Sequence, residues 1–453
     1  MEKEKLVIIG GVAAGTKAAA KARRLNPNAQ IDLFTQDTHV SYSTCGFPYF
    51  IGGNFDNEDY LFARSVEDFQ KSNINIHLKH RCSKISPQDK FVTIKNLENE
   101  EVFNFNFDKL LIATGAVPFL PKVEKINLKN IFTLRTVEDA LAIKEAALKY
   151  KHVTIIGGGY IGIELLEAFV NRGLDVTIIE SSPVIMPIFD DDMSQIITDY
   201  IFKNRPTGIE IITSDYVTEF YGNEYVEGFK TAAMRDIKTD FVVISAGVRP
   251  NVELASSCGI TLGPTGAIKV NEKMQTNFPD IYAAGDCAEK FHIIARVHVW
   301  LPLASTAIKE GRCAALNMCN ARDYFNGVSG SAVTKYFKFT MASTGLSEKS
   351  ASQYGFDPIS VVITKSDIVD YMPDAQNITL KLVADKQTRK LLGAQAIGMG
   401  NADKRINTIA SSLNCHVTVD EFLKNDLPYS PAFSTSIDPI LTATEKLIEK
   451  MDK

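Results

Sequence analysis

Short apolar runs, several of them followed by a glycine-rich turn and a helical pattern, dominate the first two thirds of the chain. Residues 6–9 (Leu-Val-Ile-Ile) lead into glycines and a helical pattern over 16–25, and residues 31–34 form the next apolar run. Residues 153–156 begin the same order again, with the next run at 176–179. Strands alternating with helices of this length predict βαβ units and parallel sheets.

The pattern changes from about residue 332. An alternating run at 378–383 predicts a strand, and residues 404–413 and 418–423 predict helices, without a further glycine-rich turn. We therefore expect an α/β protein with two Rossmann-like dinucleotide-binding domains and a C-terminal α+β domain that forms an interface.

The first glycine-rich turn joins a strand to a helix, which is the context that a dinucleotide fingerprint requires. Such a turn lets the backbone approach a pyrophosphate at the helix N-terminus. Val12 replaces the middle glycine of the fingerprint, and Thr35 stands where an acid that holds a ribose hydroxyl is expected. Taken alone, the turn has a βα connection without a ligand as its alternative. The candidate cofactor residues here are Gly10, Gly11, Val12, Ala14, Gly15 and Thr35.

The second turn, residues 157–162 (Gly-Gly-Gly-Tyr-Ile-Gly), carries the complete fingerprint, and the strand after it ends in Glu180. A carboxylate at that place hydrogen-bonds a ribose diol and repels a 2′-phosphate, so it favours NADH over NADPH. Two fingerprints predict one site for each of two dinucleotides. The candidates are Gly157, Gly159, Tyr160, Ile161, Gly162, Glu164, Glu180 and, after the strand at 241–244, Gly247.

Three further segments carry small residues that permit close passage beside a cofactor. One strand ends in Ala113, Thr114 and Gly115, and another is followed by Gly285 and Asp286. The Asp286 carboxylate is a candidate acceptor for a flavin ribityl hydroxyl, with a turn-forming aspartate as the alternative. Leu303 and Ala304 belong to a helix start whose dipole would approach a flavin ring.

One cysteine, Cys45, lies among small hydroxyl residues in the segment 41–49 (Ser-Tyr-Ser-Thr-Cys-Gly-Phe-Pro-Tyr). A helix N-terminus favours the thiolate, which is the reactive form of a thiol. Neither Cys-x-x-Cys nor Cys-x4-Cys spacing gives Cys45 a partner, so it must cycle against a small-molecule sulfur or as a sulfenic acid. A buried, inert cysteine is the alternative for a lone thiol, but the two dinucleotide turns favour the reactive one.

Lys17, Lys21 and Arg24 have the spacing i, i+4 and i+7 on the first predicted helix, so they form one cationic stripe. The stripe is either a clamp for a phosphorylated substrate or a solvated helix face.

Composition excludes some classes of protein. The 453 residues contain 49 Lys and Arg against 54 Asp and Glu, a net charge of −5 that argues against a nucleic-acid binder. No apolar run approaches the roughly 20 residues that span a bilayer, and no secretory signal is visible. Seven scattered cysteines indicate a reducing, cytoplasmic setting, and no Cys/His group has the spacing of a metal site.

Together these motifs resemble the flavoprotein pyridine nucleotide–disulfide oxidoreductases, in the branch with a single redox cysteine. That branch includes coenzyme A-disulfide reductases, NADH-dependent persulfide or polysulfide reductases, NADH oxidases and NADH peroxidases. Its oxidases and peroxidases usually carry a histidine in the first turn, where this chain has Ala13. The resemblance is therefore nearest to the coenzyme A-disulfide and persulfide reductases.

This resemblance implies FAD on the first turn, NADH or NADPH on the second, and a homodimer. The implied FAD domain comprises residues 1–118 and 252–328, the NAD(P)H domain residues 119–251, and the dimerisation domain residues 329–453. The resemblance also places Lys17, Lys21, Arg24, Ser41 and Thr44 at a coenzyme A site, and makes Tyr429 a catalytic residue that reaches the partner's active site and supplies a proton.

The expected activity is FAD-dependent reduction by NAD(P)H of a small disulfide or persulfide, such as coenzyme A disulfide or polysulfide, through Cys45. One alternative is an NADH oxidase or peroxidase that uses Cys45 as a sulfenic acid. Another is a non-catalytic nucleotide-binding redox sensor.

Overall fold

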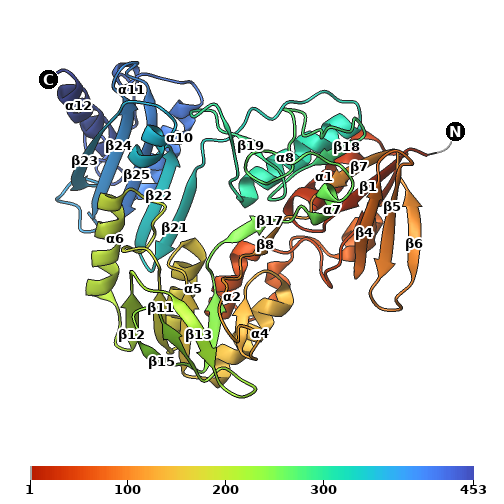
Figure 1. Ribbon diagram of the computed structural model, residues 1–453. Coiled ribbons are helices and arrows are strands. Elements are labelled where there is room, and N and C mark those ends of the chain that lie inside the picture. The colour runs from red at the N-terminus through yellow and green to blue at the C-terminus, as the bar shows by residue number, and fades with distance from the viewer. Residues whose placement is uncertain (1–2) are drawn as a thin grey trace.

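Three five-stranded sheets form the cores of three units in the computed structural model, which describes residues 3–453 (Figure 1). The first sheet has the order β18-β7-β1-β2-β3, with all neighbours parallel. Its strands are β1 (Lys5–Ile9), β2 (Gln30–Phe34), β3 (Asn75–His77), β7 (Lys109–Ile112) and β18 (Ile281–Ala283). Its central strands carry almost only buried apolar residues because helices and loops cover both faces.

Two long helices pack together in this first unit, α1 (Ala13–Leu25) and α8 (Ala304–Met318). Gly311 permits the close approach, since a Cβ added there would lie 2.3 Å from the carbonyl oxygen of Ala14. The unit also contains an antiparallel sheet of β4 (His80–Ser86), β5 (Phe91–Asn96) and β6 (Val102–Asn106). Its short elements are the 3-10 turns at Thr44–Gly46 and Glu58–Leu61, α2 (Phe47–Ile51), α3 (Val66–Lys71), α7 (Glu253–Ser256), β19 (Lys290–Phe291) and β20 (His298–Val299).

The second unit repeats the parallel arrangement, with the order β12-β11-β10-β16-β9. Its elements are β9 (Ile131–Thr133), α4 (Val137–Lys149), β10 (His152–Ile156), α5 (Tyr160–Asn171), β11 (Asp175–Ile179), α6 (Asp191–Asn204), β12 (Ile209–Ile212) and β16 (Phe241–Ile244), plus the antiparallel strands β13 (Val217–Tyr221), β14 (Gly228–Thr231) and β15 (Asp236–Lys238). This unit lies in the chain between β7 and β18, which pair in the first sheet.

The two segments of chain that connect the first and second units run side by side. The outgoing strand β8 (Ala116–Pro118) pairs antiparallel with the returning strand β17 (Val248–Pro250). A two-stranded link therefore joins the two parallel sheets.

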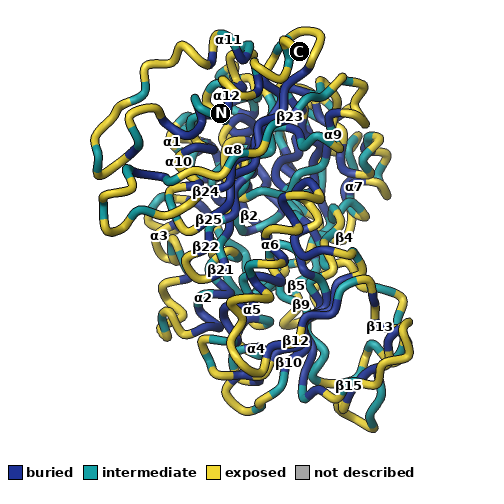
Figure 2. Tube along the Cα trace, turned by 90° about the vertical axis from the view of Figure 1, so that its left-hand side faces the viewer, coloured by how far each residue is buried: buried dark blue, intermediate teal, exposed yellow. Residues whose placement is uncertain are grey.

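The C-terminal unit is antiparallel, with the order β21-β22-β25-β24-β23. Its elements are β21 (Ala332–Tyr336), β22 (Phe339–Gly345), α9 (Glu348–Gln353), β23 (Pro358–Ser366), β24 (Asn377–Asp385), β25 (Leu391–Gly398), α10 (Ala402–Leu413), α11 (Val419–Phe422) and α12 (Pro439–Met451). Figure 2 shows buried strands inside and exposed loops around the rim.

The expected fold class is confirmed: two Rossmann-type units precede an α+β unit. The first helix begins at Ala13 rather than at residue 16, because the glycine turn itself enters the helix. The predicted domain boundaries stay a prediction, and residues 1–2 of the first domain lie outside the described residues. Within residues 3–453 every helix is too short or too polar to span a bilayer.

Candidate active site

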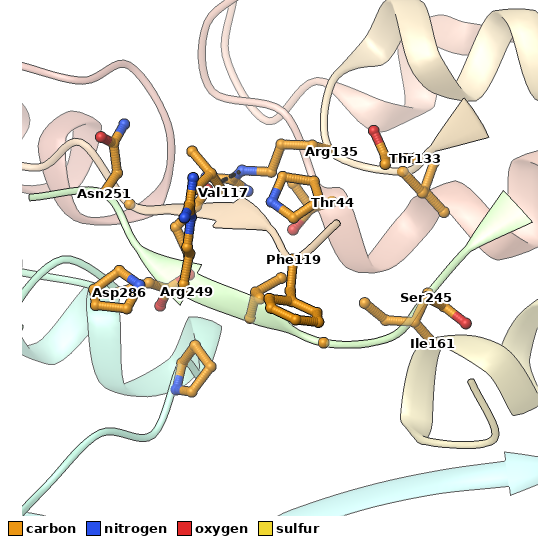
Figure 3. Close-up of a pocket in the computed structure, with 18 of the residues that line it drawn as sticks. Thr44, Val117, Phe119, Thr133, Arg135, Ile161, Ser245, Arg249, Asn251 and Asp286 are labelled. Atoms are coloured by element: carbon orange, nitrogen blue, oxygen red, sulfur yellow. Dashed lines mark hydrogen bonds between the residues drawn. The ribbon is translucent and has the colours of Figure 1, made fainter. Parts of the chain in front are cut away.

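A cavity of about 2150 Å³ opens where the three units meet. Its wall includes both glycine turns, the paired strands β8 and β17, and parts of β21 and α10 (Figure 3). A space of this size is larger than an ordinary small-ligand pocket, and residues of both glycine turns line it.

The first turn and the start of α1 form one part of this wall. Gly10 has φ +117°, and a Cβ there would lie 2.1 Å from the carbonyl oxygen of Ala113, so the turn packs directly on the end of β7. No side chain caps the start of α1. Because the first amides of a helix lack partners inside the helix, this end fits a phosphate.

Asp286 supplies an acceptor in the same region. Its Oδ1 atom is buried and has no hydrogen-bond partner among residues 3–453, although the residue lines the cavity. Burial raises the pKa of Asp286, and the charges of Lys290 and Arg135 oppose that shift. An orphaned carboxylate oxygen beside a phosphate-binding turn fits a hydroxyl donor such as the ribityl chain of FAD.

The second turn faces the cavity from the opposite unit. A Cβ at Gly157 would lie 2.5 Å from the carbonyl oxygen of Ser245, whereas one at Gly159 would meet no atom within 4 Å. Gly159 therefore leaves open space in front of α5, whose N-terminus also lacks a side-chain cap. Both carboxylate oxygens of Glu180 accept backbone amides at 2.7 Å, one from Gly158 and one from Ser182. These bonds hold the carboxylate at the end of β11.

Cys45 lies in the 3-10 turn that precedes α2, and its side chain is exposed at the cavity wall. The start of α2 was expected to favour the thiolate, and the groups around Cys45 act against that form. Burial raises the pKa of Cys45, the negative charges of Glu164 and then Asp286 raise it further, and a hydrogen bond with Thr44 acts in the opposite direction. A helix of only five residues has too small a dipole to outweigh these effects.

Glu164, on helix α5 of the second unit, lies near this cysteine. Its Oε1 atom accepts a hydrogen bond of 3.0 Å from the Thr334 hydroxyl of β21. Burial raises the pKa of Glu164. The residue was expected as a cofactor contact, and it lines the cavity near Cys45.

Most of the predicted cofactor residues lie on the cavity wall. Two of them, Gly15 and Gly162, lie behind the wall and pack against the glycine turns. Gly15 and Gly162 are inside α1 and α5, where a Cβ would lie 2.0 Å from the carbonyl oxygen of Gly10 or Gly157. The residues on the wall are Gly10, Gly11, Val12, Ala14, Thr35, Ala113, Thr114, Gly115, Gly157, Gly159, Tyr160, Ile161, Glu164, Glu180, Gly247, Gly285, Asp286, Leu303 and Ala304. The last of them begins α8, because the residues before it are extended.

The predicted substrate residues are more scattered. Thr44 is on the wall, whereas Lys17, Lys21 and Arg24 lie along α1 away from it and form no ion pair with an acid among residues 3–453. Ser41 has φ +59° and acts through its backbone: its amide donates to the Gly11 carbonyl at 2.8 Å, which ties the cysteine segment to the first turn.

Tyr429 is outside the cavity of its own chain. It lies in the loop between α11 and α12 and is 49% exposed. Within one chain, the structure therefore does not bring it to Cys45.

Sequence reasoning missed several residues of the wall. Arg135, from the segment between β9 and α4, donates from Nε to the Ala116 carbonyl at 2.9 Å, and its guanidinium rests against Gly115. Figure 3 shows Arg135, Arg249 and Phe119 around the middle of the cavity. These residues carry no local motif, so only the pairing of the crossing strands indicates them. Cys82 also lines the cavity, and burial raises its pKa to about 12.

Two models of one known family match the N-terminal and the C-terminal portions of the chain. Residues 4–311 match the pyridine nucleotide-disulphide oxidoreductase model, and residues 331–439 match the dimerisation domain of the same family. The chain belongs to this family. The resemblance inferred from its motifs is thus confirmed, and membership implies a flavin and a nicotinamide cofactor.

Individual members of the pyridine nucleotide-disulphide oxidoreductase family are similar over their whole length. A relative from Pyrococcus horikoshii, named NAD(P)H coenzyme A polysulfide/persulfide reductase, is 37% identical over 448 residues, which cover 98% of each chain. An NADH oxidase from Methanocaldococcus jannaschii is 32% identical and covers 98% of this chain and 99% of its own. The solved NAD-dependent persulfide reductase from A. fulgidus superposes with a TM-score of 0.95 at 34% identity, covering 99% of this chain and 83% of the other.

Proposed function

We propose that this protein is an FAD-dependent NAD(P)H oxidoreductase that reduces a small disulfide or persulfide of the coenzyme A type through Cys45. The observation that carries the proposal is the position of Cys45 on the wall of one cavity with both dinucleotide turns. The sulfur is exposed there and has no second cysteine beside it in the turn.

The first turn, the start of α1 and Asp286 would hold the FAD, and the second turn with Glu180 would hold the nicotinamide nucleotide. Bound FAD supplies two-electron chemistry between a hydride donor and a sulfur acceptor. The carboxylate of Glu180 supports NADH as the donor, with NADPH as the alternative.

The chain's own chemistry is thiol–disulfide exchange at Cys45. The Cys45 thiolate attacks one sulfur of the substrate RSSR, and the other sulfur leaves as a thiolate. Two electrons and one proton then convert the mixed disulfide Cys45–SR into the Cys45 thiolate and RSH. The net reaction consumes one NADH and one proton for each disulfide and yields two thiols.

The substrate contacts belong to the same proposal. Lys17, Lys21 and Arg24 are a cationic stripe without an acidic partner among residues 3–453, which suits phosphates, and Thr44 hydrogen-bonds beside the sulfur. We place Tyr429 in the site of a partner chain in a homodimer, which its position outside its own cavity supports. The seven free cysteines support a cytoplasmic location.

The decisive test is Cys45→Ser. We expect the purified variant to retain bound flavin and its bleaching by NADH, while disulfide-dependent NADH oxidation falls by at least about a hundredfold, because the nucleophile is lost. Cys415→Ser, at an exposed cysteine of the C-terminal unit, is the control and should keep full activity. Undiminished disulfide turnover in Cys45→Ser would falsify the proposal.

An NADH oxidase is the second candidate, because the Methanocaldococcus jannaschii relative carries that name. In that case Cys45 would cycle through a sulfenic acid. Oxygen consumption without added disulfide, compared with anaerobic turnover of coenzyme A disulfide, separates the two. We expect the anaerobic disulfide reaction to be the faster one.

A further inference from the structure

Three side chains form hydrogen bonds with the backbone of the turn at Gly285 and Asp286. The Gly285 amide donates to Glu310 Oε2 at 2.7 Å, and Lys290 Nζ donates to the Gly285 carbonyl at 2.9 Å. Trp300 Nε1 donates to the Asp286 carbonyl at 2.7 Å. Three backbone groups of two successive residues are thus each bound by a side chain.

Two of these side chains form a buried ion pair. Lys290 Nζ and Glu310 Oε1 are 3.5 Å apart, and both side chains have 0% exposure. Glu310 Oε1 has no hydrogen-bond partner among residues 3–453. Removing two charges from water costs so much that buried pairs are often no more stabilising than apolar residues of the same size. Stability alone therefore does not explain the pair.

The location of the turn indicates what the Lys290–Glu310 pair does. Gly285 has φ +85°, and a Cβ there would lie 3.2 Å from the Cβ of Ala14, at the start of α1. On the other side of the turn, Asp286 lines the cavity, and its buried Oδ1 atom has no hydrogen-bond partner among residues 3–453. The turn thus sets the spacing between a phosphate-binding helix start and a hydroxyl-binding carboxylate.

We propose that Lys290 and Glu310 are positioning residues for the flavin cofactor, holding the turn so that Asp286 and the start of α1 contact the same FAD. The pair touches neither cofactor nor substrate and acts through the Gly285 backbone. This inference rests on the proposed FAD cofactor.

The test is the rate at which purified holoenzyme releases FAD, followed by the rise in flavin fluorescence. Lys290→Met and Glu310→Met each leave one buried charge unpaired and should lower stability as well as FAD retention. The double variant Lys290→Met/Glu310→Met leaves no unpaired charge, but it leaves the Gly285 amide and carbonyl without their side-chain partners. It should unfold at a higher urea concentration than either single variant and still release FAD at least about tenfold faster than the wild type, equivalent to about 1.4 kcal/mol.

Two further variants separate positioning from packing. Glu310→Gln keeps an acceptor for the Gly285 amide, so it should release FAD more slowly than Glu310→Met. Arg312 lies on the same helix as Glu310 and forms an exposed ion pair with Asp323, which lies beyond the end of that helix. Arg312→Ala removes this pair and should release FAD at the wild-type rate. Trp300 is the single tryptophan, so its emission should shift in the variants that free the turn and stay unchanged in Arg312→Ala.

Wild-type release rates in the double variant and in Glu310→Met would overturn the inference. Purified wild-type protein without FAD would instead overturn the proposed cofactor, so the two failures are distinguishable.

Discussion

The thiol of Cys45 lies in an environment that disfavours its reactive form. Surrounding protein raises its pKa, and Glu164 of the second unit adds a negative charge. A raised pKa means that the thiolate is absent at low pH and accumulates only as the pH rises through the shifted value. One of the charged residues that raise the pKa of the sulfur is thus supplied by helix α5 of the second unit.

Glu164→Gln should shift this titration to lower pH. At the alkaline pH where the thiol titrates, Glu164 is a carboxylate, so its removal eliminates a repulsion against the thiolate. We expect the midpoint of the rate of Cys45 alkylation by iodoacetamide against pH, in a chain with the other six cysteines replaced, to move downward by a measurable fraction of a pH unit.

Glu167→Gln is the matched control, since Glu167 shares the helix but binds Lys335 and the Phe337 amide. Equal midpoints in wild type and Glu164→Gln would show that the carboxylate does not act on the sulfur.

At the scale of elements, α2 follows the 3-10 turn that carries Cys45 and is anchored at its other end. Arg172, at the end of α5, donates from Nε to the Ile51 carbonyl at 2.8 Å, and its guanidinium lies against Gly53. Lys144 of α4 lies 3.8 Å above the ring of Phe50. Both cations come from the second unit, so the short helix is held across the unit boundary.

Arg172→Ala should loosen this anchor. Loss of a charged hydrogen bond costs about 1.5–3 kcal/mol, so we expect a lower urea midpoint and a severalfold fall in disulfide turnover. Arg205→Ala is the control, because that exposed arginine also donates to a helix-end carbonyl, that of Phe202 within its own unit. Its cost should stay below about 0.5 kcal/mol. The same midpoint for both variants would contradict an anchoring role.

Local patterns account for the elements and for the two turns. Apolar runs flanked by glycine predict β1, β10 and the helices after them, because the turn, the strand period and the helix start are all encoded within about twenty residues. They do not reveal Arg249, which reaches the cavity through the pairing of β17 with β8. They do not reveal Arg135 either, which follows β9 and donates to the Ala116 carbonyl of β8. The Lys290–Glu310 pair is equally hidden, since two charged residues predict exposure until the fold buries them together.

At the scale of the whole molecule, the cavity draws its wall from all three units, including α10 of the C-terminal unit. The family and the fold class follow from motif order and are confirmed. Tyr429 lies outside the cavity of its own chain, so its predicted catalytic role requires a partner chain. Its loop is fixed from behind by the buried Arg405, which binds Asp438 and Ser434, while the tyrosine itself is half exposed.

Mixed dimers test whether Tyr429 serves a partner chain. Cys45→Ser and Tyr429→Phe place their defects in different chains, so a dimer of one each has one complete site if the tyrosine acts across the interface. Random exchange should then restore disulfide turnover toward about a quarter of the wild-type level. Activity no higher than the average of the unmixed variants would assign Tyr429 to its own chain or to no catalytic role.

The insertion of the second unit between β7 and β18 has a consequence for biosynthesis. On the ribosome, the first sheet lacks its β18 edge until residue 283 has emerged, and α1 lacks its α8 neighbour until about residue 318. The inserted unit is complete earlier and is free to fold first. The nascent chain therefore completes its first unit after the inserted one, although β1 and α1 are translated first.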